Sequence, residues 1–169
     1  MRGQATRVIE IYCGQVVIAD PGYDKGCRGY FSHAAKKGDW MTYIEYDDST
    51  GTPCFLGAVH LDYENSYLDL PDTELDDVLG VDSGQMSIYD KEEYDYAHEK
   101  DRFNDFYDDV AYGYDRSGKE GTLSEQCFYA DNFGIATRTH YGDGCCYATL
   151  FTEGEGTDSP IVAIEIDLC

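Results

Sequence analysis

Short apolar segments separated by glycine-rich and acidic turns run through the whole chain. Two of these segments, residues 13–20 and 83–90, share the frame Gly-Gln-x-x-Ile-x-Asp, and a tyrosine follows each of them at Tyr23 and Tyr94. Such a frame predicts a short strand that begins after a glycine turn and ends at an aspartate. The repetition of the frame indicates that the chain contains two related halves.

A second pair of matching segments follows the frames. Residues 38–46 and 142–150 both begin with Gly-Asp, and each continues through a polar loop to a second apolar segment, 56–62 or 161–167. Each set predicts a turn and a β-hairpin, which is too small to be stable alone. We therefore expect one domain, 1–169, with pseudo-repeats 8–66 and 79–168. Its fold class is mainly β (α+β), an internally duplicated antiparallel β-sandwich or barrel.

The second half carries an additional segment between its frame and its hairpin. Phe103, Phe106, Tyr107 and Val110 are spaced at i, i+3, i+4 and i+7, which predicts one inserted amphipathic helix near 91–111. Asp90 precedes this helix and is a suitable N-cap residue.

Two of these motifs resemble those of an uncharacterised family of small phage and bacterial proteins. Its members carry a Val-Asp-x-Gly-x-x-x-Ile-x-Asp strand and a later Gly-Tyr-Gly-Asp-Gly-x-Tyr element before a C-terminal hairpin; the matching segments here are 81–90 and 141–147. The family often has Asp-Pro-Cys-Tyr after the strand, and the first half of this chain has Asp20-Pro21-Gly22-Tyr23 there. The second half departs from that pattern, because residues 90–94 read Asp-Lys-Glu-Glu-Tyr. The resemblance implies a β-rich fold and a phage or mobile-element setting, and it supplies no activity.

The charge of the chain narrows the class of partner. There are 34 Asp and Glu against 12 Lys and Arg, a formal net charge of −22, whereas solubility of a small domain needs a magnitude of only ~2–8. A field of this sign repels nucleic acid and anionic membranes and attracts basic protein surfaces. We therefore expect no direct nucleic-acid binding, no membrane association and a basic partner.

The acidic residues are concentrated in an acidic connector, 62–82, and an acidic insertion, 90–115, which also contain many tyrosines. Carboxylates form forked hydrogen bonds to arginine, and tyrosine rings stack on guanidinium groups. The alternative is a solvated acidic face that only aids solubility. The predicted partner-binding residues are Asp69, Asp72, Glu74, Asp76, Asp77, Glu92, Glu93, Tyr94, Asp95, Tyr96, Asp101, Asp105, Asp108 and Asp109.

Other chemistry has weaker support in the sequence. His140 lies near Cys145 and Cys146, and the aspartates at 20, 90, 39 and 143 repeat between the halves, but turn formation and strand capping explain these patterns without catalysis. Residues 20–26 only partly match a calcium loop, and the sequence lacks the Cys-x-x-Cys pair that would indicate a zinc site. We therefore expect no catalytic residue, cofactor or metal. Without an apolar leader or spanning segment, a cytoplasmic protein with reduced thiols is expected.

The leading hypothesis is a non-enzymatic inhibitor from a phage or mobile element that blocks the basic nucleic-acid channel of a host defence protein. A CRISPR nuclease or a restriction enzyme is the expected target class, and carboxylates would take the place of phosphates. One alternative is a small-molecule-binding or hydrolytic protein with a site between the two β lobes, lined by the Gly-Asp turns with Trp40, Tyr43 and Tyr147. Another is a cytosolic immunity protein that neutralises a basic toxin.

Overall fold

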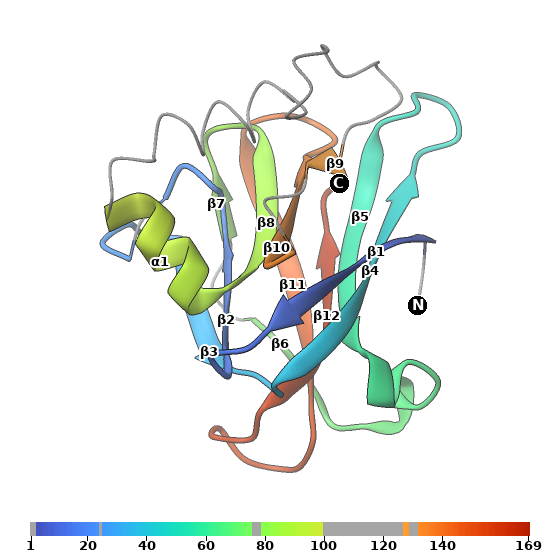
Figure 1. Ribbon diagram of the computed structural model, residues 1–169. Coiled ribbons are helices and arrows are strands. Elements are labelled where there is room, and N and C mark those ends of the chain that lie inside the picture. The colour runs from blue at the N-terminus through green and yellow to red at the C-terminus, as the bar shows by residue number, and fades with distance from the viewer. Residues whose placement is uncertain (1–2, 24, 76–78, 100–126, 129–131) are drawn as a thin grey trace.

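Two antiparallel sheets pack face to face in the computed structural model, which describes residues 3–23, 25–75, 79–99, 127–128 and 132–169 (Figure 1). The large sheet has the order β1-β4-β5-β12-β11-β6, with β7 also paired to β11, and the small sheet has the order β3-β2-β8-β10-β9. The expected mainly β fold is confirmed, and it takes the form of a sandwich.

The strands of the large sheet are β1 (Gln4–Ile11), β4 (Gly38–Tyr46), β5 (Pro53–His60), β6 (Asp72–Glu74), β7 (Leu79–Val81), β11 (Gly144–Thr152) and β12 (Ile161–Asp167). Those of the small sheet are β2 (Gln15–Ala19), β3 (Phe31–Ala34), β8 (Gln85–Asp90), β9 (Cys127–Phe128) and β10 (Gly134–Arg138). Among the described residues, the helical elements are the 3-10 turns η1 (Leu61–Tyr63) and η2 (Tyr67–Asp69) and the helix α1 (Lys91–Glu99). None of the helices within the described ranges has the length and apolar character that crossing a bilayer requires.

The main core lies between the sheets, because alternate strand residues point toward the facing sheet. Trp40 is its largest side chain and is completely buried. Burial of a large apolar side chain stabilises a fold by roughly 1.5–3 kcal/mol, so this layer supplies most of the stabilisation. Its members include Ile9, Ile44, Leu56, Ile164 and Ile166 from the large sheet, and Val16, Ile18, Met86, Ile88 and Ile135 from the small sheet.

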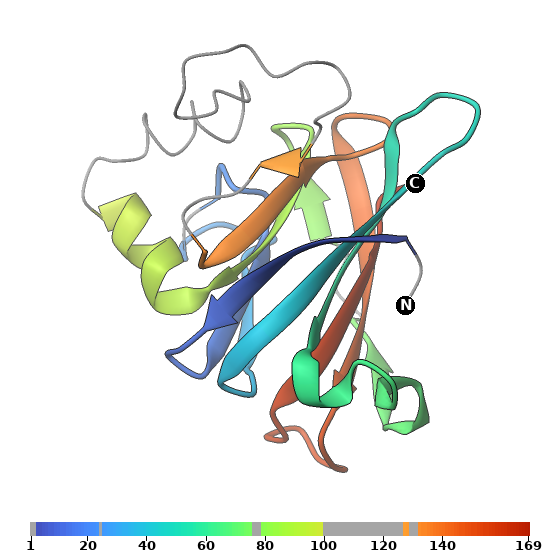
Figure 2. The ribbon, with the colours of Figure 1, turned by 45° about the vertical axis from the view of Figure 1, so that its right-hand side comes forward.

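Each sheet also has an outer face that is partly covered. On the small sheet, Val17 and Tyr89 pack against Tyr94 of α1. On the large sheet, Val59 and other apolar residues pack against Tyr67 of η2. The helix and the 3-10 turns therefore lie on opposite sides of the sandwich, as Figures 1 and 2 show.

The strand registers reveal an internal two-fold relation. In the small sheet Ile18 pairs with Ile88, its own counterpart in the sequence frame. In the large sheet Ile11 faces Gly38 just as Val81 faces Gly144. Extending these registers through the hairpins gives Gly57 of β5 and Glu165 of β12 as counterparts, and these two residues also pair with each other. The two-fold axis thus passes through the centre of both sheets.

Gly38 therefore corresponds to Gly144, and the expected match of Gly38 with Gly142 is wrong by two residues. The connection between β3 and β4 consists of residues 35–37, whereas the connection between β10 and β11 consists of residues 139–143. The longer connection displaces the Gly-Asp pair of the second half from the strand into the preceding turn. The Gly-Asp similarity is consequently local and does not mark equivalent positions.

Asp20 and Asp90 connect the two halves by reciprocal hydrogen bonds. Asp20 Oδ2 accepts from the backbone N–H groups of Asp82 and Ser83 at 2.8 and 2.7 Å. Asp90 Oδ2 accepts from the N–H groups of the equivalent residues Tyr12 and Cys13, both at 2.9 Å. Each carboxylate thus closes the turn that precedes the other half's frame. This explains why an aspartate ends both frames.

Both carboxylates are fully buried and also accept within their own half. Asp20 Oδ1 accepts from the N–H of Gly22, and Asp90 Oδ1 accepts from the N–H of the equivalent residue, Glu92. A buried carboxylate is tolerated when hydrogen bonds satisfy its oxygens. Asp90 therefore also caps α1, as the sequence predicted, and α1 begins at Lys91. The remainder of the expected helix, 100–111, lies outside the described residues.

Candidate functional site

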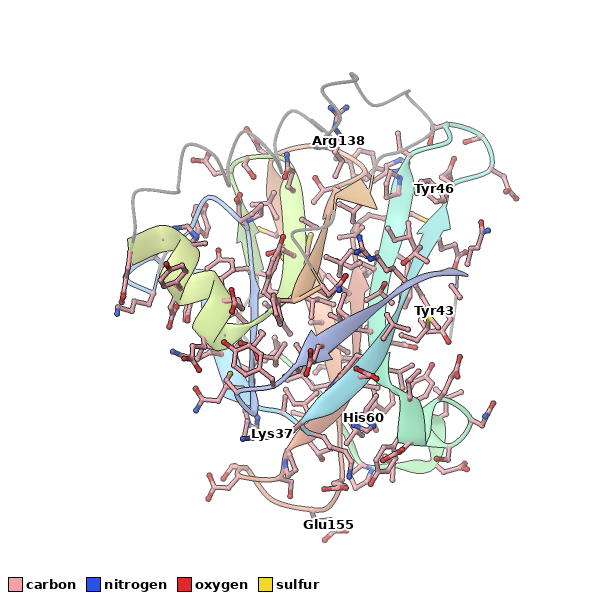
Figure 3. The ribbon with its side chains drawn as sticks, viewed as in Figure 1. Lys37, Tyr43, Tyr46, His60, Arg138 and Glu155 are labelled. Atoms are coloured by element: carbon pink, nitrogen blue, oxygen red, sulfur yellow. The ribbon has the colours of Figure 1, made fainter. Side chains whose placement is uncertain are left out.

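The outer face of the large sheet contains rows of side chains that run across its strands. One row is Tyr43, Gly57, Glu165, Thr149 and Glu74, as the strand pairings specify. Because side chains in a strand alternate between faces, all members of such a row point to the same side of the sheet. This side is turned away from α1, and Tyr43 is labelled on it in Figure 3.

One half of this outer face is apolar and covered. Val59, Ala163, Phe151 and Tyr43 form a cluster with Tyr67. The ring of Tyr67 meets that of Phe151 edge to face, with centroids 4.9 Å apart. Such a pair contributes about 0.5–1.5 kcal/mol beyond its buried area. The acidic connector is thus anchored on the sheet through this cluster.

The other half is concave, acidic and open. It contains a cavity of about 290 Å³. Tyr147 at its rim exposes 59% of its surface. Among the described residues, no Lys, Arg or His lines this cavity. We call it the acidic groove, and its lining residues are Phe55, Glu74, Leu75, Tyr147, Ala148, Thr149, Glu165 and Asp167.

The two-fold relation maps the acidic groove onto the covered half. Glu165 corresponds to Gly57, and Asp167 corresponds to Val59. In the same way, Tyr147 corresponds to Met41. Equivalent positions therefore carry acidic and exposed aromatic residues in one half and apolar residues in the other. The apolar half binds the chain's own connector, while the acidic half has no such cover from the described residues.

Tyrosine hydroxyls hold several carboxylates of this side in place. Tyr67 donates to Glu165 Oε1 at 2.8 Å, and Tyr43 donates to Glu64 Oε1. Burial, followed by the hydrogen bond to Glu64, raises the pKa of Tyr43 to about 12. The Tyr43 hydroxyl therefore keeps its proton and remains a donor throughout the physiological pH range.

A second hydrogen-bonded pair of a tyrosine and a carboxylate, Tyr63 and Glu153, lies beside the covered half. Glu153 accepts from Lys36 Nζ at 2.7 Å and from the Tyr63 hydroxyl. The hydrogen bond from Lys36, followed by that from Tyr63, lowers the pKa of Glu153. Lys36 Nζ also lies 5.2 Å from the centroid of the Tyr63 ring. The protein itself thus combines a carboxylate, a tyrosine ring and a lysine in the manner expected for a basic partner.

The structure separates the predicted partner-binding residues into two groups. Asp69, Asp72 and Glu74 are exposed on the side of the large sheet, and Glu74 lines the acidic groove. Glu92 and Tyr96 are exposed on α1, on the opposite side of the sandwich. One flat partner surface cannot contact both groups at once. Asp76, Asp77, Asp101, Asp105, Asp108 and Asp109 lie outside the described residues.

The prediction that Tyr94 contacts a partner is wrong. Its side chain is completely buried between α1 and the small sheet, and its hydroxyl donates to the carbonyl oxygen of Asp20 at 2.9 Å. Burial is the main reason that its pKa is raised well above the usual value. The apolar positions Tyr94 and Ala97, spaced at i and i+3, are the sequence signal for this buried helix face.

Glu93 and Asp95 are also engaged within the fold. Tyr12 donates to Glu93 at 3.1 Å, and Tyr30 donates to Asp95 at 2.8 Å. Lys91 forms an ion pair with Asp95 along the helix. The acidic residues of α1 therefore satisfy local donors to a greater extent than Asp72 and Glu74 do. The exposed carboxylates on the groove side are therefore the less engaged of the two groups.

The residues expected to line a pocket between the lobes do not come together. Trp40 points into the core, where its Nε1–H donates to the Lys36 carbonyl at 3.0 Å. Tyr43 and Tyr147 lie on the opposite, outer face of the same sheet, in the covered half and the acidic groove respectively. The concave surface formed here is thus on the outside of the large sheet.

The candidate catalytic groups take structural positions. The four aspartates do not form a common site, because Asp20 and Asp90 are buried acceptors, whereas Asp39 and Asp143 are exposed at strand ends. His140 Nδ1 hydrogen-bonds to Thr52 at 2.7 Å.

Cys146, one of the two cysteines near His140, is poorly suited to nucleophilic attack. Burial raises the pKa of Cys146 to about 12, which keeps its thiol protonated at neutral pH.

Within the described part of the chain, no three His, Cys, Asp or Glu side chains are grouped closely enough to hold a metal ion. The carboxylates of the acidic groove are therefore arranged as separate acceptors.

Sequence reasoning missed two carboxylates of the acidic groove, Glu165 and Asp167. They occupy alternate positions in an otherwise apolar strand, and this spacing was an available signal that both point to a solvent-facing side.

Comparison with protein-family models, curated protein sequences and solved structures found no match to this chain.

Proposed function

We propose that this chain is an acidic, non-enzymatic inhibitor protein of phage or mobile-element origin. It acts in the host cytoplasm and blocks the basic nucleic-acid channel of a host defence protein, such as a CRISPR nuclease or a restriction enzyme. The acidic groove supports this proposal most directly, because Glu74, Glu165 and Asp167 line a concave surface without a neighbouring Lys, Arg or His among the described residues. The resemblance of residues 81–90 and 141–147 to a phage and bacterial family supports the setting.

The sheet presents the carboxylates as a regular array. Residues two apart in a strand are about 7 Å apart on one face, and neighbouring strands are about 5 Å apart. Glu165 and Asp167 are two residues apart on β12, and Glu74 lies on β6, with β11 between the two strands. Negative groups at such spacings match the multiple Lys and Arg side chains that line a nucleic-acid channel.

The array is held in place before a partner arrives. Because Tyr67 fixes Glu165 by a hydrogen bond, less side-chain freedom is lost on binding. Exposed Tyr147 provides a ring on which an arginine can stack. The excess of 34 acidic over 12 basic residues speeds the encounter with a positive surface. The same features would serve an immunity protein against a basic toxin, and the identity of the captured target separates the two functions.

Affinity capture from a host lysate at low and high salt tests this function. We expect the wild-type chain to retain a nucleic-acid-binding protein at low salt and to release it at high salt, because salt screens the opposite charges. In a purified assay, the chain should prevent that protein from binding its nucleic acid. Retention of only acidic proteins, or capture that salt does not weaken, would contradict the proposal.

Matched variants assign the docking surface. The double variant Asp72→Lys/Glu74→Lys reverses the charge beside the acidic groove, and Glu92→Lys/Glu99→Lys makes the same change in net charge on α1. All four positions are exposed, so both variants should fold. We expect the first to lose capture and the second to retain it. Equal loss in both variants would mean that net charge, and not the groove, determines binding.

A further inference from the structure

The acidic groove is bordered by a strand whose outer edge pairs with no other described strand. β6 is the terminal strand of the large sheet, and all three of its residues, Asp72 to Glu74, are exposed. An edge strand presents a row of N–H and C=O groups that can pair with another extended chain. The directions of these groups in β6 follow from its pairing with β11.

The hydrogen bonds on either side of β6 determine those directions. The Leu75 N–H donates to the Ala148 carbonyl at 2.9 Å, and the Thr152 N–H donates to the Pro71 carbonyl at 3.0 Å. Antiparallel pairing alternates, so Pro71, Thr73 and Leu75 direct their backbone groups toward β11. The N–H and C=O groups of Asp72 and Glu74 therefore point away from the sheet, toward the open edge.

The opposite edge of the large sheet is used in part by the chain itself. β1 is the terminal strand at the other side of the large sheet. There the Glu10 N–H donates to the Asn132 carbonyl at 2.6 Å, and Arg7 Nη2 donates to the Asn132 side chain at 2.5 Å. The β1 edge is thus closed at Glu10, the counterpart of Gly80 in β7, by the protein's own residues. At the β6 edge, beside the acidic side chains, no further strand is paired within the described part of the chain.

We propose that an extended, basic segment of the partner protein adds to β6 as a further antiparallel or parallel strand. This inference rests on the proposed function and specifies how the partner is held. Charge complementarity identifies the occupant: a residue of the added strand opposite Glu74 lies on the outer face, in the same row as Glu74 and Glu165. The segment therefore carries Lys or Arg at every second position.

The added strand gains two kinds of contact. Its backbone pairs with the N–H and C=O groups of Asp72 and Glu74, which is the mode of recognition known as β-augmentation. Its basic side chains reach the carboxylates of the acidic groove, and Tyr147 offers a ring for one of them. Backbone pairing gives affinity without demanding a particular sequence, while the carboxylates select for positive charge.

Two labelled octapeptides of equal charge test the inference by fluorescence anisotropy. One alternates lysine with valine and can form a strand; the other alternates N-methyl-lysine with N-methyl-valine and cannot, because it lacks the backbone N–H groups that a strand donates. We expect the lysine–valine peptide to bind the wild-type protein at least about tenfold more tightly, a difference of ~1.4 kcal/mol. The amide signals of Asp72 and Glu74 should shift and gain protection from hydrogen exchange.

A pair of variants separates the backbone from the charge. Glu74→Pro removes the outward N–H and the carboxylate, whereas Glu74→Gln removes only the carboxylate. Both keep the hydrogen bonds to β11, and a thermal melt checks that they fold. We expect the preference for the lysine–valine peptide to persist in Glu74→Gln and to disappear in Glu74→Pro. Should Glu74→Pro not fold, the hydrogen-exchange result on the wild-type protein decides.

The outcomes distinguish the two proposals. If both peptides bind equally tightly in a salt-dependent manner, the acidic docking surface stands and strand addition is overturned. If neither peptide binds at low salt, the proposed function fails together with the inference. If the lysine–valine peptide is preferred but the amides of Asp72 and Glu74 are unaffected, a strand adds elsewhere and β6 is not the edge concerned.

Discussion

The two halves of the large sheet's outer face are equivalent by the internal two-fold relation but opposite in character. One half is apolar and is covered by η1 and η2, whose Tyr67 packs on Phe151. The other half contains Glu165 and Asp167 in place of Gly57 and Val59, and it remains open. The comparison shows that one duplicated surface stabilises the fold, whereas its counterpart is not covered by any of the described residues.

Exchanging the apolar and the acidic residue at one pair of equivalent positions, Val59 and Asp167, gives the largest expected difference in the free energy of unfolding. Val59→Asp places a carboxylate in the covered half, where Val59 is completely buried, and should reduce the free energy of unfolding by at least about 4 kcal/mol. Asp167→Val, at the exposed counterpart, should change it by no more than about 0.5 kcal/mol. Urea unfolding measures both. Similar destabilisation by the two changes would refute the distinction between a covered and an open half.

Removing either reciprocal carboxylate, Asp20 or Asp90, should destabilise the connection between the two equivalent halves. Asp20→Ala and Asp90→Ala each leave several partly buried N–H groups without an acceptor, and we expect a loss of about 3–5 kcal/mol in either case. Because the two sites are equivalent, their losses should be similar. Asp39→Ala, an exposed aspartate, is the control and should be nearly neutral. A loss of less than ~1 kcal/mol at both buried sites would contradict this account.

Truncating one aromatic residue in each half sharpens the contrast further. Tyr67→Ala removes the anchor of the acidic connector and should cost about 3–4 kcal/mol of stability. Tyr147→Ala removes an exposed ring and should leave stability within about 0.5 kcal/mol of the wild type. For partner binding we expect the opposite order, with Tyr147→Ala weakening the complex more than Tyr67→Ala does. Thermal melts combined with the capture assay provide both measurements.

The acidic insertion offers a competing docking surface, and charge reversal discriminates between the two. We expect Asp72→Lys/Glu74→Lys to lower the association rate by at least about tenfold at low salt. The change Asp105→Lys/Asp108→Lys/Asp109→Lys should have a smaller effect on that rate if the acidic groove is the main contact. Stopped-flow association at several salt concentrations measures the difference. A larger effect of the triple change would move the docking surface to the insertion.

The smallest expected effect is a pH dependence in the covered half. Tyr43 has a pKa raised from 10.0 to about 12 in the folded protein, mainly by burial. Between these values the unfolded chain loses the proton while the folded chain keeps it, so the free energy of unfolding falls as pH rises from about 10 to 12. Below pH 10 this contribution is fully present. Tyr43→Phe should flatten that part of the curve, and an unchanged slope would contradict it.

The order of strands and turns follows largely from local sequence. Alternation of apolar and polar positions, together with the glycine turns, predicted β2 and β8 and the aspartates that end them. The capping role of Asp90 also followed from its position before α1. These features depend on neighbours in the chain and on the period of the strand or helix, both of which are visible without coordinates.

The grouping of the acidic residues could not be obtained in the same way. Glu74 and Glu92 are close in the sequence, yet β6 pairs with β11 in the large sheet, whereas α1 covers the small sheet. The sheet to which each segment attaches depends on long-range pairing, for which the intervening residues give no local signal. Tyr94 was misassigned for a related reason, since its side chain is buried only because β2 and β8 lie beneath the helix.

The sequence alone determined a duplicated, acidic, mainly β protein with turns at its glycines and aspartates, because propensity, alternation and charge are properties of neighbouring residues. Only the tertiary structure brought Glu74, Tyr147 and Asp167 from three strands into one groove and made β6 the terminal strand of the large sheet among the described residues. Strand pairing between distant segments decides which side chains share a face, and a shift of one residue in register would have turned the groove's carboxylates toward the core.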